Sequence, residues 1–292
     1  MTINLRKISE FCITVGYACN FKCAHCGVSV KRGLSLSSPE ITLLVDTIVK
    51  HNFGSLLFVG GEPTLYIGKI NLILSGIGKS SKPRVVITTN GHFAGSKVSA
   101  IRTLSSFDRL NSVQLSYDKF HKKFLPAANI KHLYSACREL GMDFRVLLSI
   151  DSPLDLVLVK ELQAVGTFNV AVQKVQPIGD AGKNGLMPNY PSFDADVLRK
   201  KCPNRTKLIY MCGEGFTTCC SYLAFQDDSA KYIHPTEKAH FTSPFYKLIS
   251  KLTFSGLMKK IKVSSNEFLP EHSDPCGICR HIFQEAVRIG RV

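Results

Sequence analysis

The sequence of 292 residues has no long uninterrupted run of apolar residues. Lys, Gly, Ser or Asp breaks every such run before it reaches the roughly 18 to 20 residues that a membrane-spanning helix needs. The opening segment, MTINLRKISE, also lacks the long apolar centre of a secretory signal peptide. We therefore expect a cytoplasmic protein without a membrane segment.

Acidic residues are scarce as well, since 22 Asp and Glu stand against 37 Lys and Arg. The resulting formal charge of +15 predicts an acidic partner, such as a carboxylated or phosphorylated substrate, an acidic peptide, or an electron donor of the flavodoxin or ferredoxin kind. A surface that merely keeps the protein in solution explains the charge equally well. The basic stretches 199–207 and 259–262 lack the interleaved aromatic residues of a single-strand nucleic-acid platform. Nucleic acid is therefore a disfavoured partner.

Cysteine, in contrast, is abundant, with eleven copies in the chain. A reducing cytosol disfavours a disulfide framework, and several of these cysteines stand at spacings typical of metal ligands. Metal binding is therefore the better interpretation of the cysteine content.

Short β-rich runs alternate with longer segments of helical periodicity as far as about residue 177, which favours parallel strands joined by right-handed crossovers. We therefore predict an α/β fold over residues 1–190. Beyond Pro177, glycine and proline mark a boundary, which predicts a second, smaller domain over 191–292. The expected strands are 11–15, 55–59, 85–89, 113–116, 144–150 and 168–175. The expected helices are 39–51, with Ser38 as its N-cap, 67–79, 96–106, 130–140 and 154–165.

Three cysteines follow the first expected strand at the spacing C-x3-C-x2-C, namely Cys19, Cys23 and Cys26. One loop with these gaps can wrap three thiolates around an iron-sulfur cube and leave its fourth iron open as a binding site. A structural zinc ion would need a fourth ligand, such as His25. We expect His25 to pack against the loop instead.

This loop resembles the hallmark of the radical S-adenosylmethionine (SAM) superfamily, in which it follows the first strand of the barrel. Further segments at successive strand ends resemble that family's SAM-binding motifs, and they contain Gly60, Gly61, Glu62, Pro63, Asn90, Ser116, Asp118, Gln176 and Pro177. The resemblance covers about residues 8 to 180 and implies a partial (β/α)6 TIM-like barrel. It also implies a [4Fe-4S] cluster whose open iron chelates SAM, and reductive cleavage of SAM to a 5'-deoxyadenosyl radical.

The later cysteines resemble the twitch form of the SPASM extension, in which C-x(9–15)-G-x4-C and a later C-x2-C hold an auxiliary [4Fe-4S] cluster. The resemblance implies an electron-transfer role for this cluster and the ligands Cys202, Cys220, Cys276 and Cys279. Cys219 competes with Cys220, which the spacing after Gly215 favours. A four-cysteine zinc ribbon is the alternative.

Four cysteines have no ligand role in this scheme, namely Cys12, Cys137, Cys212 and Cys219. Packing is the expectation for each. The alternative is that one of them donates a hydrogen atom to a substrate radical, and Cys212 and Cys219 are the candidates we name. His121, just past the fourth expected strand, is a candidate for proton transfer.

Two enzymatic interpretations and one non-enzymatic interpretation follow. In the first, which we favour, the enzyme modifies a ribosomally made peptide. Against it, the expected barrel begins within about ten residues of Met1, so we expect no separate leader-recognition domain. In the second, a dehydrogenase or epimerase acts on a small molecule such as an aminosugar or nucleotide derivative. The third, an iron-sulfur scaffold or regulatory protein, conflicts with an intact GGEP segment beside the three-cysteine loop.

Overall fold

The computed structural model describes residues 8–31, 33–78, 82–264 and 267–291. These residues group into two compact units. The first consists of Ser9–Met187 together with Tyr210–Gly213. The second is built mainly from Pro188–Ile209 and Glu214–Val292.

The first unit is organised around six parallel strands in the order β6-β5-β4-β3-β2-β1. Each strand pairs in parallel with the next one along the chain, so that Cys12 lies opposite Leu57 and Val86 opposite Ser112. The strands are β1 (Glu10–Thr14), β2 (Ser55–Val59), β3 (Arg84–Thr89), β4 (Ser112–Ser116), β5 (Asp143–Ile150) and β6 (Asn169–Lys174). The predicted α/β fold with parallel strands is confirmed.

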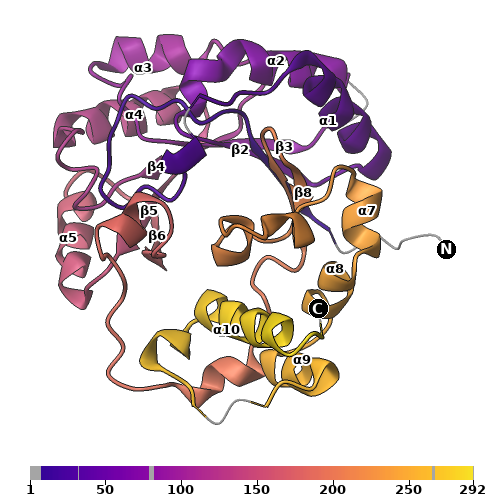
Figure 1. Cartoon of the computed structure of the whole chain (residues 1–292). Helices are drawn as coiled ribbons and strands as arrows, with labels where there is room; N and C mark the ends of the chain where they lie inside the picture. Colours follow the sequence, from indigo (N-terminus) through magenta and orange to yellow (C-terminus); the bar gives the residue numbers. More distant parts are fainter. Residues whose placement is uncertain (1–7, 32, 79–81, 265–266, 292) are drawn as a thin grey trace. The chain divides into compact units, whose positions relative to one another are not determined.

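Five helices connect these strands and lie on the outer side of the curved sheet (Figure 1). They are α1 (Ser38–His51), α2 (Ile67–Gly76), α3 (Lys97–Leu104), α4 (Ala127–Glu139) and α5 (Val157–Gln163). The N-cap of α1 is Ser37, one residue earlier than expected, because the Glu40 carboxylate accepts the Ser37 backbone N–H at 2.7 Å. The segment expected to open the fifth helix is instead a 3-10 turn, Pro153–Leu156. Lys79, the expected end of the second helix, lies outside the described residues.

The core of this unit consists of apolar side chains that alternate along the strands, and Phe11, Ile13, Leu56 and Phe58 are completely buried. Leu57, which lies between two of them on the opposite face, is only half-buried, so one face of the strands is covered more deeply than the other. Because the strands are parallel, their carboxyl ends meet at one edge, where ligands of such folds gather. The loops at this edge carry the first cysteine group and the segments expected to bind SAM.

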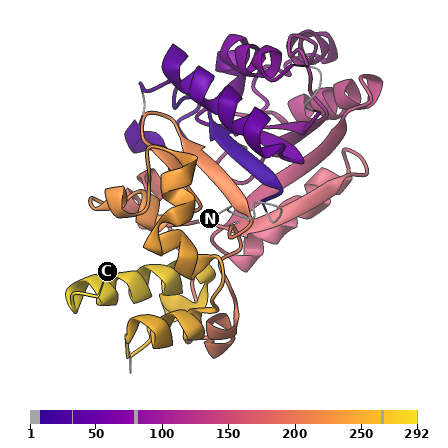
Figure 2. The same cartoon turned by 90° about the vertical axis from the view of Figure 1, so that its right-hand side faces the viewer.

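The second unit is mainly helical. Its elements are the 3-10 helices Ala195–Arg199, Tyr222–Ala224, Ser229–Lys231 and Pro270–Ser273, the strands β7 (Lys207–Met211) and β8 (Gly215–Thr217), and the helices α7 (Glu237–Thr242), α8 (Pro244–Ile249), α9 (Phe254–Ile261) and α10 (Pro275–Arg288). The last two residues of β7 belong to the first unit. Helices α9 and α10 lie side by side (Figures 1 and 2) and share one hydrophobic core with α8, in which Phe245, Phe254 and Phe283 are buried. Among the described residues, no helix combines the length and apolar character needed to cross a membrane.

Candidate functional site

The three-cysteine loop follows β1 directly. Cys23 is buried, while Cys19 and Cys26 are half-buried, and the Cys26 backbone N–H donates to the Cys23 carbonyl at 3.1 Å. Burial raises the pKa of the Cys19 thiol, and the Phe21 N–H, which donates to its sulfur at 3.4 Å, opposes that rise. Three thiols on one loop are a donor set that suits an iron-sulfur cluster with one open corner.

The end of β2 lies directly against this loop. Gly61 and Glu62 donate their backbone N–H groups to the carbonyls of Gly16 and Ala18, each at 2.9 Å. A Cβ atom on Gly61 would stand 2.2 Å from the Ala18 carbonyl oxygen, so only glycine fits. Gly60 is confined in the same way, since a Cβ atom there would stand 2.2 Å from the Gly16 carbonyl oxygen. The structure fills that space with the backbone of the cysteine loop, so the glycines first serve to shape the loop.

Glu62 is buried where the carboxyl ends of the strands meet, and its hydrogen bonds connect the end of β2 with the end of β3. Its carboxylate accepts from the Thr64 N–H (3.1 Å) and hydroxyl (2.7 Å), from the Thr89 hydroxyl (2.7 Å) and from the Asn90 N–H (2.8 Å). Burial raises its pKa despite these hydrogen bonds. Three of these donors contact Oε1, and the Asn90 N–H contacts Oε2. Each carboxylate oxygen has two lone pairs, so Oε2 keeps the capacity to accept from an ammonium group.

Asp118 lies beyond β4, fully buried, between two histidines. Its oxygens lie 2.9 Å from His121 Nδ1 and 3.3 Å from His25 Nε2. Burial alone would raise the pKa of Asp118, but its hydrogen bonds and charge interactions with the two histidines hold that pKa well below its usual range. Asp118 thus fixes the orientation of both imidazole rings.

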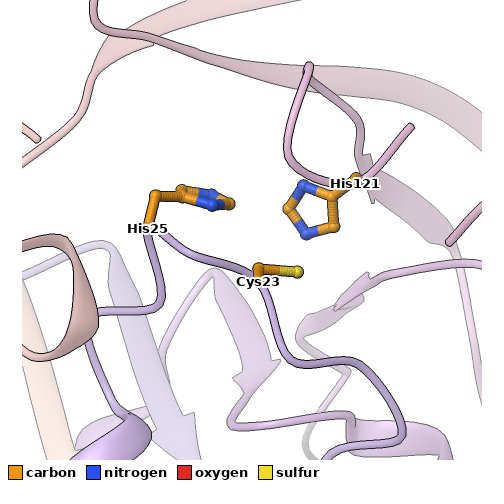
Figure 3. Close-up of side chains that lie close together, drawn as sticks. All are labelled: Cys23, His25 and His121. Carbon is orange, nitrogen blue, oxygen red and sulfur yellow. The ribbon is translucent and has the colours of Figure 1, made fainter. Parts of the chain in front are cut away.

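Cys23, His25 and His121 converge in this region, and one potential ligand atom of each lies within 4.8 Å of the others (Figure 3). The trio could hold a single metal ion, with Asp118 as the carboxylate that orients both histidines. The His25 ring also stacks on Phe120, which lies beyond β4, with ring centroids 4.4 Å apart. A single ion on this trio would use only one of the three thiols of the loop.

The segment after β6 also touches the cysteine loop. The Asp180 N–H donates to the Cys26 carbonyl at 2.9 Å, and Asn184 Nδ2 donates to the Ala24 carbonyl at 2.8 Å. Gly179, at φ +57°, lies so close that a Cβ atom there would be 2.5 Å from the Cys26 carbonyl oxygen. The neighbouring Gln176 and Pro177 and, at the end of β4, Ser116 are half-buried.

The second cysteine group lines one pocket in the second unit. Its members are Cys202, Cys219, Cys220, Cys276 and Cys279. Cys276 and Cys279 stand three residues apart in the first turn of α10, whose N-cap, Asp274, accepts the Cys276 N–H at 2.8 Å. Burial raises the pKa of Cys202 to about 11 and of Cys219 to about 12. Such thiols ionise near neutral pH only beside a strong positive charge, which a metal centre supplies.

The pocket contains one cysteine more than a four-thiolate site needs. Cys220 accepts a hydrogen bond from Asn204 Nδ2 at 2.9 Å, while Cys219 packs against the hydrophobic core beside Cys202 and Cys279. Both therefore remain ligand candidates. Cys212 is completely buried in the turn after β7 and is not part of the pocket lining.

Several residues of these sites were missed in the sequence. The Tyr66 hydroxyl accepts the Ala18 N–H at 2.9 Å, and Thr64 and Thr89 complete the contacts of Glu62. Thr64 directly follows GGEP, so its position was a usable signal. Asn184 and Asn204 gave none, because their partners become neighbours only in the folded chain.

Comparisons with known proteins agree with this geometry. Residues 13–144 match the model of the radical SAM superfamily. The "Putative peptide biosynthesis protein YydG" of Bacillus subtilis (strain 168) is 22% identical, over 95% of this chain and 92% of that protein. A "Probable GTP 3',8-cyclase" of Saccharolobus solfataricus is 30% identical, over 36% of this chain and 34% of that protein. The solved structure "Native anSMEcpe with bound AdoMet and Cp18Cys peptide" superposes with a TM-score of 0.55 at 15% identity, over 96% of each chain.

The matched family segment runs from β1 to the start of β5 and includes the three-cysteine loop, Glu62, Asn90 and Asp118. Residues 13–144 of the chain are a radical SAM domain, and the protein is a radical SAM enzyme. The family implies a [4Fe-4S] cluster and SAM as cofactors.

Proposed function

We propose that this radical SAM enzyme acts on a peptide and abstracts a hydrogen atom from a side chain or the backbone during peptide maturation. The observation that carries this proposal is the likeness to YydG, a protein named for peptide biosynthesis, along almost the whole of both chains. The excess of basic residues suits an acidic segment of such a peptide, and equally an acidic electron donor such as flavodoxin or ferredoxin.

The residues of the first unit have distinct parts in this proposal. The proposed ligands of the cluster are Cys19, Cys23 and Cys26. When the cluster is reduced, the cluster and SAM together would supply a 5'-deoxyadenosyl radical. The side chains and backbone proposed to surround SAM are those of Gly60, Gly61, Glu62, Pro63, Ser116, Asp118, Gln176 and Pro177. Asp118 orients His25 and His121 by its contacts at 3.3 and 2.9 Å. A proton held at His121 would therefore stay beside a buried carboxylate.

The second cysteine group would hold an auxiliary [4Fe-4S] cluster that transfers electrons. Cys202, Cys276, Cys279 and one of Cys219 and Cys220 are its proposed ligands, and all five line one pocket. This supports a division into a barrel over 1–190 and an auxiliary-cluster domain over 191–292. A zinc ion in the same pocket is the competing proposal, because four thiolates suit either.

Metal analysis and a cleavage assay test these proposals together. Reconstituted enzyme should contain about eight irons and eight acid-labile sulfides per chain, whereas about four irons and one zinc would contradict the auxiliary cluster. Anaerobic incubation with SAM and dithionite should release 5'-deoxyadenosine. A panel of candidate peptides should contain one that accelerates that release and whose mass, or deuterium content in D2O, changes. Peptides that all stay unchanged while SAM is cleaved would contradict the peptide substrate.

A nucleotide derivative is the second candidate substrate. The local 30% identity to a GTP 3',8-cyclase favours it, although the match spans about a third of that protein. The same assay with GTP in place of the peptide separates the two candidates. GTP-dependent release of 5'-deoxyadenosine, with loss of GTP, would replace the peptide proposal.

A further inference from the structure

Asn90 directly follows β3 and is buried, with only 5% of its surface exposed. Its side-chain nitrogen lies 2.7 Å from the Asn20 side-chain oxygen and 3.6 Å from the sulfur of Cys19. Its side-chain oxygen accepts the His92 N–H at 3.0 Å, and its backbone N–H donates to Glu62 at 2.8 Å. Both donors of the amide thus already have acceptors within the chain.

The contact with sulfur has a chemical consequence. A side-chain N–H and the backbone N–H of Phe21, at 3.4 Å, both donate to the same Cys19 sulfur. Hydrogen bonds to a ligating sulfur stabilise the more negative, reduced state of an iron-sulfur cluster and thereby raise its reduction potential. The effect is large where the donor is buried, because little water competes for the sulfur.

We propose that Asn90 is a positioning residue that sets the reduction potential of the SAM-binding cluster through Cys19, and is not a ligand of SAM. The inference rests on the proposed role of Cys19 as a cluster ligand. It revises the expectation from the sequence, which assigned Asn90 to SAM. Asn90 also supports the cysteine loop directly, because its side-chain nitrogen contacts Asn20, the residue next to Cys19.

Three variants separate the sulfur contact from loop support. Asn90→Ala removes the donor, and Asn90→Leu removes it with little change in the size of the side chain and no change in charge. Asn20→Ala removes the other acceptor but leaves the contact between Asn90 and Cys19. Asn184→Ala is the matched control, because this amide holds the same loop through the Ala24 carbonyl, at 2.8 Å, and not through a sulfur.

The measurement is a redox titration of each reconstituted variant. The titration is monitored through the paramagnetic signal that changes when SAM is added. Both Asn90 variants should shift the midpoint potential to more negative values, with unchanged affinity for SAM. Asn20→Ala and Asn184→Ala should stay at the wild-type potential. The potential is read from whatever fraction retains its cluster, so incomplete loading does not hide the shift.

Two results would overturn the inference. One is a wild-type potential in both Asn90 variants. A fall in their SAM affinity at the same time would assign Asn90 to SAM binding instead. The other is an equal shift in Asn20→Ala, which would assign the effect to loop shape. If the wild-type protein lacks any SAM-responsive signal, the proposed function itself fails, and this outcome differs from both.

Discussion

The two cysteine groups are built in opposite ways. Cys19, Cys23 and Cys26 share one loop, and most of the contacts that hold it are made to backbone atoms, from Gly61, Glu62, Asp180 and other residues. The second group draws its thiols from three separate segments, around Cys202, Cys219 and Cys276, that meet on a hydrophobic core. The first site therefore depends on the shape of one loop, and the second on the packing of several elements.

Replacement of Cys23 by Ala should have the largest effect on the first site. The loop would keep two thiols, too few to hold the cluster with an open corner, so about four irons per chain should be lost. Release of 5'-deoxyadenosine should fall to the level without enzyme. Iron analysis and chromatography measure both.

His121→Ala and Cys137→Ala are the controls for that variant. Cys137 is completely buried in α4, and it belongs to neither cysteine group. Both controls should keep all their iron. Loss of metal in His121→Ala would instead indicate a single ion held by Cys23, His25 and His121.

Cys276→Ala should produce the complementary loss. About four irons should disappear while the SAM-responsive paramagnetic signal and the cleavage of SAM remain. Turnover of the peptide should stop, because the proposed electron acceptor is gone. Loss of both clusters together would show that the two sites do not load independently.

Cys219→Ala and Cys220→Ala sharpen the comparison further. The pocket offers five thiols for four positions, so one of the two variants should lose about four irons and the other none. The variant that keeps its iron lacks the thiol that is not a ligand. Its turnover then shows whether that thiol donates a hydrogen atom to a substrate radical. Full turnover in that variant would remove this role.

The smallest effect concerns pH. His240 is completely buried in the second unit, with Nε2 at 2.9 Å from the Thr218 hydroxyl, and burial lowers its pKa to about 3. The folded protein keeps His240 neutral, while the unfolded chain binds a proton below about pH 6.5. Its contribution to stability is therefore complete above that pH and is lost as the pH falls toward 3.

Anaerobic urea unfolding at pH 7.5 and 5.5 tests this direction. Across that interval, wild-type protein should lose about 1 kcal/mol more of its unfolding free energy than His240→Gln. Equal losses in the two proteins would contradict the buried neutral state of His240.

The sequence predicted the strands of the first unit well, because alternation of strand and helix is a repeated local pattern. It also predicted a loop with three cysteines after the first strand, because these residues are neighbours in the chain, and their role as cluster ligands stays a prediction. It could not show that Glu62 accepts hydrogen bonds from Thr89 and Asn90, because β2 and β3 meet only after folding. Spacing alone could not choose between Cys219 and Cys220 either, because both side chains reach the same pocket.

Gly179 carries a consequence for biosynthesis. Its left-handed backbone brings the Asp180 N–H to the Cys26 carbonyl, more than 150 residues earlier in the chain. A nascent polypeptide that ends at β5 already contains the three cysteines. It lacks the Asp180 backbone N–H that donates to the cysteine loop. The hydrogen bond that holds Cys26 therefore forms only after the chain has been synthesised as far as residue 180 of 292.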